Sequence, residues 1–386
     1  MSKITRRAAL AAGFAAAAGG GLYWWYNRKP PLGTTLDAGL LERGRSLVAN
    51  STVVDIHAHP GRFFLTGADP DSLLIKLMRD GYEAERIADM QAAQVTASLF
   101  AIVADLQVLG IKKGGLQTVR AFEPCEAWAD FQRQLLRLQA DIESGLMRLA
   151  LTPADILAAK KDGWPVALLC CEGGDFIEDD VSRVADVYAE GLRSITLMHY
   201  NGNNLGDTQT GTVVHGGLTP TGHEVVAEMN RIGMLIDVAH ASTKTCKDVI
   251  DTSTQPVMLS HSILEMPGAE SPRLISLEHA RLIADNGGVI GAWPAGIGSA
   301  TLADYAAQIM ALVDAVGVEH VAIGSDMDAN YKPVLTEYAD FPLLAAILLQ
   351  RGLREEAVTA ILGGNFMRLF SAVSNVSSSQ ARSNTP

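Results

Sequence analysis

The chain has 386 residues, 48% of them hydrophobic and 19% charged, and its formal net charge is −12. This apolar content excludes a disordered chain, and the negative charge argues against a nucleic-acid-binding protein, which needs clustered Lys and Arg. Four cysteines are too few for a disulfide scaffold.

Residues 1–30 are predicted to be a targeting segment that precedes the folded domain. Lys3, Arg6 and Arg7 form a basic start, and an Ala/Gly-rich apolar stretch follows, ending in the aromatic residues 24–26. An arginine pair before a weakly hydrophobic segment resembles a twin-arginine export signal, while the aromatic cluster would suit a membrane anchor. We therefore expect a periplasmic protein, or one anchored facing the periplasm. An Ala-rich helix with two chance arginines is the alternative.

Eight short, mostly continuous apolar runs are predicted to be strands that are buried on both faces, as in a parallel sheet. They cover residues 53–56, 96–103, 166–171, 194–198, 234–239, 256–260, 288–293 and 320–325. Helical patterns lie between or after them, at 71–94, 123–145, 222–233, 277–286, 302–316 and 355–370. Thr221 and Glu224 have capping-box spacing before the stop signal Gly233, and Gly363-Gly364 should weaken or bend the last helix.

This alternation of eight strands with helices predicts an α/β fold, the (β/α)8 TIM barrel. A doubly wound open sheet would more often have fewer strands, and no glycine-rich nucleotide loop follows the first run. Without an internal repeat or a linker, residues 31–372 are predicted to form one barrel domain. Residues 373–386 are polar, small and aperiodic, and are expected to be a disordered tail.

Polar residues follow the predicted strands at the end where barrels carry their chemistry. They are His57 and His59 after the first strand, then Glu172, His199, His240, His261 and Asp326 after the third, fourth, fifth, sixth and eighth. The other four histidines fall in loop, helix or strand-start positions and receive no role. Asp328 is expected to be a solvated neighbour of Asp326. The cysteines lack metal-binding spacing and are predicted to be small buried apolar residues.

The residue types indicate a divalent-metal site. His57 and His59 alternate at a strand end, so both imidazoles can reach one ion, and Glu172 follows a buried run where an unpaired charge would be costly. Imidazoles with one carboxylate suit Zn²⁺, with Co²⁺, Mn²⁺ or Fe²⁺ also open. The economical arrangement has two ions, one bound by His57 and His59 and the other by His240 and His261, with Glu172 between them.

From Val53 to about Phe370 the chain resembles the membrane (renal-type) dipeptidase family of metallopeptidases, within the amidohydrolase-like metal-dependent hydrolases. The motifs are DIHAHPG at 55–61, CEGGD at 171–175, LMHYNGNNLGD at 197–207, HGGLTPTGHEVVAEMNRIGMLIDVAHAS at 215–242, LSHS at 259–262, SPR at 271–273, IGSDMD at 323–328 and GGNFMR at 363–368. The block at 215–242 is the most specific of them.

The resemblance implies a role for each matching residue. Glu172 would be the bridging glutamate, and His240 and His261 the later metal ligands. His199 would contact the substrate near the scissile carbonyl. Arg273 would pair with the substrate's terminal carboxylate. Asp326 would receive the substrate's free amine and shuttle protons. The chain departs from the family at His57-x-His59, where members usually carry His-x-Asp, and so loses one negative charge.

The predicted function is a zinc-dependent dipeptidase with Asp326, His199 and Glu172 as catalytic residues. It would hydrolyse dipeptides, including those with C-terminal D-residues, by attack of a metal-bound hydroxide. The alternative is a related amidohydrolase acting on N-acyl amino acids, β-lactams or lactones. A non-catalytic binding barrel is a further possibility, against which the complete set of ligand residues argues. The resemblance also suggests a homodimer, and the first 30 residues could tether it to a membrane.

Overall fold

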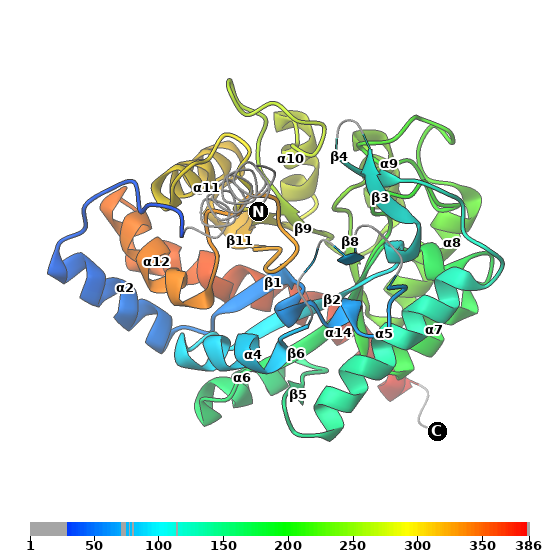
Figure 1. Cartoon of the computed structure of the whole chain (residues 1–386), viewed down its shortest axis with the longest axis horizontal. Coiled ribbons are helices and arrows are strands. Elements are labelled where there is room, and N and C mark those ends of the chain that lie inside the picture. The colour runs from blue at the N-terminus through cyan, green and yellow to red at the C-terminus, as the bar shows by residue number, and fades with distance from the viewer. Residues whose placement is uncertain (1–28, 71–74, 77, 79–80, 113–114, 384–386) are drawn as a thin grey trace, which may run out of the picture.

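The computed structural model describes residues 29–383, apart from 71–74, 77, 79–80 and 113–114 (Figure 1). The predicted export signal or anchor covers residues 1–30. All of it except residues 29 and 30 lies outside the described residues.

Eight parallel strands form a closed barrel, and all eight predicted strands are present. They are β1 (Val54–Ala58), β2 (Ala97–Val103), β6 (Val166–Glu172), β7 (Leu192–Thr196), β8 (Leu235–Asp237), β9 (Met258–Ser262), β10 (Val289–Ala292) and β11 (Val321–Ile323). They pair in the order β2-β1-β11-β10-β9-β8-β7-β6, and β2 closes the ring by pairing with β6. Every residue of these strands is buried, as their continuous apolar runs predicted. The fold is therefore the predicted (β/α)8 barrel.

Three short strands were not predicted. β5 (Arg148–Leu149) pairs with the start of β6, before the residues of β6 that pair with β7. β3 (Leu109–Lys112) and β4 (Gly115–Thr118) form an antiparallel hairpin that follows β2. The hairpin begins six residues after the carboxyl end of β2. It therefore lies at the same end of the barrel as the polar residues.

Helices surround the strands on the outside (Figure 1). Their bounds are α2 (Ala38–Asn50), α4 (Glu83–Ala92), α5 (Glu126–Glu143), α6 (Pro153–Asp162), α7 (Ser182–Ala189), α8 (Pro220–Ile232), α9 (Thr243–Thr252), α10 (Leu277–Asp285), α11 (Leu302–Val316), α12 (Phe341–Gln350), α13 (Glu355–Thr359) and α14 (Asn365–Ser383). The bounds of α11 equal the prediction. The long helix predicted at 71–94 is reduced, within the described residues, mainly to α4.

The start of α8 corrects one prediction. Its N-cap is Thr219, whose side chain accepts a hydrogen bond from the backbone N–H of Gly222, and Pro220 occupies the first turn. Proline fits there because its missing N–H would be unpaired anyway. The capping box predicted at Thr221 was wrong, since that residue already lies inside the helix. Gly233 ends α8 in the left-handed conformation, as predicted.

The C-terminal segment closes the amino-terminal end of the barrel. A π-helical turn (Ala360–Gly364) interrupts it at Gly363, which confirms the predicted irregularity there. Beyond this turn, α14 contributes Phe366, Leu369 and Phe370 to the cluster that fills the barrel interior. Glu355–Asn375 is long and apolar enough to cross a membrane, but half of its most apolar window is buried, as in a core helix. α14 continues past the predicted helix end at 370, and the domain boundary at 372 stays a prediction.

Candidate metal centre

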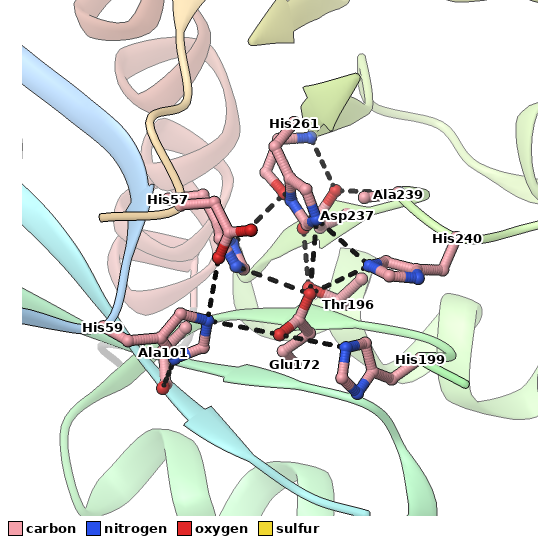
Figure 2. Close-up of polar contacts among 12 residues, drawn as sticks. His57, His59, Ala101, Glu172, Thr196, His199, Asp237, Ala239, His240 and His261 are labelled. Carbon is pink, nitrogen blue, oxygen red and sulfur yellow. Dashed lines mark hydrogen bonds and ion pairs between the residues drawn. The ribbon is translucent and has the colours of Figure 1, made fainter. Parts of the chain in front are cut away.

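Glu172, the last residue of β6, lies at the centre of a ring of imidazoles (Figure 2). Its Oε1 is 2.9 Å from Nε2 of His240, 3.4 Å from Nε2 of His261 and 3.5 Å from Nε2 of His57. Its Oε2 is 3.3 Å from Nε2 of His59 and 3.4 Å from Nε2 of His199. None of these six residues is more than 6% exposed. The structure thus brings together every histidine that was predicted to lie at a strand end.

Irregular strand pairing aims these side chains inward. The register of β1 against β2 shifts between Asp55 and Ala58, that of β9 against β10 shifts ahead of Ser262, and that of β6 against β7 shifts two residues before Glu172. Bulge-like irregularities re-aim side chains and are common next to active sites. His240 and Asp326 have φ values of 63° and 52°, a left-handed conformation that is costly for residues other than glycine. The backbone is therefore strained at two of the predicted site residues.

Asp326 and Arg273 flank the ring of imidazoles. Oδ1 of Asp326 is 3.4 Å from Nε2 of His59, and its Oδ2 accepts a 3.1 Å hydrogen bond from Nε1 of Trp293. Nη1 of Arg273 donates to Oε1 of Gln209 at 2.6 Å, while its Nη2 lies 3.1 Å from Nε2 of His240. The same guanidinium lies over the Trp293 ring, 5.2 Å from its centroid. One indole therefore contacts both residues that were predicted to bind the two charged ends of a substrate.

The side chains of the ring shift one another's pKa values. Burial would raise the pKa of Glu172, but the surrounding His199, His57 and His240 hold it well below its ordinary value. Burial opposes protonation of His59, yet its carboxylate partners Asp326 and Glu172 raise its pKa to about 10. At His240, burial and the nearby Arg273 hold the pKa well below its ordinary value. Glu172 is therefore an ionised carboxylate that is surrounded by inward-facing ring nitrogens.

The donor set fits a divalent metal. Three overlapping groups have all their ligand atoms within 4.8 Å of one another: His57, Glu172 and His261; His57, His59 and Asp326; and Glu172, His199 and His240. Nε2 of His57 is buried and has no hydrogen-bond partner among the described residues. Imidazole nitrogens and carboxylate oxygens are the ligands that Zn²⁺ and similar ions take. These residues therefore form a divalent-metal site, and His199 belongs to one of the three groups although it was predicted to contact the substrate.

Several supporting residues were missed from the sequence. Asp105 accepts from Nδ1 of His199 at 2.6 Å, and Ser260 contacts Nδ1 of both His57 and His261. Asp105 comes directly after the second strand run and its extension, so its position could have been noticed by the same rule as the others. Ser260 and Gln209 carry no such signal, because short polar residues are common in strands and loops.

Two predictions about individual side chains were wrong. The side chain of Asp328 is only 4% exposed and is not solvated. It accepts hydrogen bonds from the backbone N–H of Gly61, the hydroxyl of Tyr82 and two guanidinium nitrogens of Arg86. Cys125 is exposed, whereas the other three cysteines are buried as predicted.

Two curated proteins that resemble the chain in sequence are named as dipeptidases. Dipeptidase verJ of Clonostachys rogersoniana is 34% identical over 241 residues, which are 61% of this chain and 62% of that protein. Dipeptidase tcpJ of Claviceps purpurea is 29% identical over 260 residues, 64% of this chain and 60% of that protein. The chain thus spans about three-fifths of the length of these curated relatives.

Solved structures share the fold along most of the chain. The probable dipeptidase PvdM from Pseudomonas aeruginosa has a TM-score of 0.72 at 19% identity, covering 88% of this chain and 99% of its own. A metallopeptidase from Rhodobacter sphaeroides, liganded with a phosphinate mimic of the dipeptide L-Ala-D-Ala, has a TM-score of 0.70 at 18% identity, covering 84% and 99%.

The family assignment comes from the sequence itself. The model of the membrane dipeptidase family, peptidase family M19, matches residues 41–384, which include every residue of the site described above. Both this match and the metal centre agree with the resemblance seen in the motifs. The chain belongs to the membrane dipeptidase family of metallopeptidases.

Proposed function

We propose that the protein is a zinc-dependent dipeptidase that holds two ions and hydrolyses the amide bond of dipeptides, including those with a C-terminal D-residue. The observation that carries this proposal is the position of Glu172, whose two carboxylate oxygens both lie within 3.5 Å of inward-facing imidazole nitrogens. A carboxylate with histidines on either side is suited to bridge two ions. The dipeptidase relatives and the dipeptide mimic bound to the Rhodobacter enzyme support the substrate class.

The metal supplies the electrophilic chemistry: when bound, divalent ions polarise a carbonyl oxygen and lower the pKa of water. The chain's own residues bind and orient the substrate around that centre. The guanidinium of Arg273 offers a planar donor set to the terminal carboxylate, and Gln209 and Trp293 fix its orientation. Its Nε is buried without a hydrogen-bond partner in the described structure, so a donor remains for a ligand.

His199 and Asp326 would handle the charge and the proton of the reaction. Asp105 fixes His199 so that its Nε2 faces the centre, where an N–H can bond to the carbonyl oxygen as negative charge develops. Asp326 is oriented by the indole N–H of Trp293, and its other carboxylate oxygen faces His59. That carboxylate would bind the free amine of the substrate and pass a proton to the leaving amine.

A second candidate follows from His59, which stands where family members usually carry aspartate. An added imidazole in place of a carboxylate makes the centre less negative and could favour other amides or esters. N-acyl amino acids, β-lactams and lactones are the substrates of this alternative. N-acyl amino acids keep a carboxylate for Arg273 but lack the free amine that Asp326 would bind, so the two functions can be separated directly.

The test combines metal analysis with a substrate panel on the purified protein. The panel contains dipeptides with L- or D-residues at the C-terminus, the matching N-acetyl amino acids, a β-lactam and a lactone. We expect two zinc ions per chain and hydrolysis of dipeptides. Glu172→Ala and His240→Ala should each abolish hydrolysis and lower bound metal, whereas His223→Ala, outside the site, should do neither. Retained dipeptide hydrolysis in both site variants would overturn the proposal.

We also propose that the twin-arginine-type segment exports the protein to the periplasm and can tether it to the membrane, and that the protein is a homodimer. The Arg6-Arg7 pair supports the export route, and the family resemblance supports the dimer. Replacing both arginines with lysine should keep the protein in the cytoplasm. Sedimentation equilibrium of the purified protein should give twice the chain mass, and a monomer mass would contradict the dimer.

A further inference from the structure

Ser260 lies between two imidazoles of the metal centre. It belongs to β9, directly before His261, and is fully buried. Its Oγ is 3.0 Å from Nδ1 of His261 and 3.3 Å from Nδ1 of His57. The two rings lie 4.1 Å apart, at an angle of 30°. Their Nδ1 edges thus share one hydroxyl, while their Nε2 atoms lie 3.4 Å and 3.5 Å from the same oxygen of Glu172.

We propose that Ser260 is a positioning residue that fixes the tautomer of His57 and His261 together, so that both rings present a bare Nε2 to the metal. This inference rests on the metal site of the proposed function. A neutral imidazole carries its proton on one nitrogen only, and a nitrogen that binds a metal cannot carry it. When both Nε2 atoms are ligands, both Nδ1 atoms are therefore N–H donors. A hydroxyl oxygen has two lone pairs and can accept from both.

The other imidazole rings of the centre show why this sharing matters. Nδ1 of His59 has its own acceptor, the carbonyl oxygen of Ala101 at 2.8 Å, and Nδ1 of His199 has Asp105. Nδ1 of His240 has no partner among the described atoms. Ser260 is thus the one described side chain whose Oγ contacts two rings of the centre.

The backbone of Ser260 is held in place from several sides. The N–H of Ser260 donates to Oδ1 of Asp237 at 2.9 Å, and Oδ2 of that aspartate accepts from Thr196 at 2.6 Å. The carbonyl oxygen of Ser260 packs against Gly291 and Gly324, where an added Cβ would lie 1.8 Å from it in each case. Because neither neighbour leaves room for movement, the barrel fixes the backbone from which the Ser260 hydroxyl extends.

Removing the hydroxyl should therefore weaken metal binding in particular. In Ser260→Ala both Nδ1–H groups lose their acceptor at once, and the tautomer with a proton on Nε2 is no longer disfavoured. Losing one such partner typically lowers metal affinity about 10–100-fold, and since one hydroxyl serves two rings we expect about 100-fold. Ser260→Thr keeps the hydroxyl and should recover most of this affinity.

Ser262→Ala is the matched control. Ser262 lies two residues further along β9 and is also buried, but its hydroxyl donates to the carbonyl oxygen of Arg273 at 2.9 Å and has no hydrogen bond to a histidine in the described part of the chain. Its removal should leave zinc affinity within about threefold of the wild type, since no ligand ring loses a partner.

The experiment measures Zn²⁺ affinity by competition with a chromophoric chelator, using the metal-stripped full chain and its variants. Equal affinity in Ser260→Ala, Ser262→Ala and the wild type would overturn the inference, whereas a wild type that binds no zinc would contradict the proposed function instead. ¹⁵N NMR of histidine-labelled, zinc-loaded wild type is independent of variant folding. It should show Nδ1–H on both His57 and His261, and zinc bound through Nδ1 of either ring would also overturn the inference.

Discussion

Nδ1 of His199 lies 2.6 Å from Oδ1 of Asp105, and both side chains are buried beside the metal centre. The other carboxylate oxygen of Asp105 accepts from the backbone N–H groups of Tyr200 and Asn201. Asp105 therefore fixes both the ring and the segment that carries it. Burial disfavours the charged form of His199, but Asp105 and Glu172 raise its pKa above the ordinary value.

Asp105→Asn should lower kcat for dipeptide hydrolysis by about 10–100-fold, the usual loss when the partner of a functional imidazole is removed. Asparagine keeps the shape but removes the charge that stabilises the protonated ring. Steady-state kinetics and zinc content should be measured together, with Asp180→Asn on the surface as the control. Unchanged zinc with reduced kcat agrees with a substrate role for His199, while an equal loss of zinc would make His199 a ligand.

Arg273→Met should raise KM for dipeptides by about 100-fold, because a charge-assisted bidentate interaction with the terminal carboxylate contributes up to about 3 kcal/mol. Gln209→Ala should raise KM less, since the guanidinium remains but loses the partner of its Nη1. Dipeptide amides, which lack the carboxylate, are the matched substrates. Their KM should be insensitive to Arg273→Met, and an equal rise for amides and acids would contradict the assignment.

Asp328→Asn should destabilise the protein by about 3 kcal/mol, because the guanidinium of Arg86 loses its buried counter-ion and keeps only the more exposed carboxylate of Asp89. Chemical denaturation measures the change in the free energy of unfolding. The control is Asp251→Asn, whose carboxylate is 59% exposed and pairs with Lys247 on the surface, and which should show no measurable change. Arg86→Met combined with Asp328→Asn should recover part of the loss. A double variant as unstable as the sum of the single ones would contradict the pairing.

His279 makes stability depend on pH. Burial lowers its pKa from 6.5 to about 4, so the unfolded chain takes up this proton at a higher pH than the folded protein does. The resulting stability is fully present above pH 6.5 and is lost as the pH falls towards 4, by up to about 3 kcal/mol at 1.36 kcal/mol per pKa unit. In His279→Leu, unfolding measured between pH 7 and pH 4 should lose this contribution, so its stability should fall less than that of the wild type. If the free energy of unfolding changed with pH equally in the wild type and in His279→Leu, this role of His279 would be contradicted.

The strands and the candidate ligands could be predicted from the sequence because both depend on local patterns. A strand that is buried on both faces is a continuous apolar run, and the polar residue after it lies at the carboxyl end of the barrel. The helices α2, α6, α7, α9 and α12 were not predicted. For α2 and α12 the reason is that a local pattern is lacking. α12 is almost wholly apolar and has no helical period, and its partner α2 lies some 300 residues earlier in the chain.

The supporting residues depend on partners that are distant in sequence. Asp328 looked solvated because Arg86, which pairs with it, is 242 residues away. Similarly, Ser260 contacts His57 only because the fold brings β1 close to β9. The two residues are 203 positions apart in the sequence. Contacts between residues so far apart in sequence cannot be predicted from local spacing. The ligands can be predicted, because their residue type and the strand before each of them identify them.

The position of α14 has a consequence for how the chain folds during its synthesis. The interior of the barrel is completed by Phe366, Leu369 and Phe370, which follow β11 and so leave the ribosome after all eight strands of the barrel. The barrel itself closes only when β11 pairs with β1, across more than 260 residues. A nascent chain therefore exposes apolar strand surface until α14 has been synthesised, and we expect it to depend on chaperones over that interval.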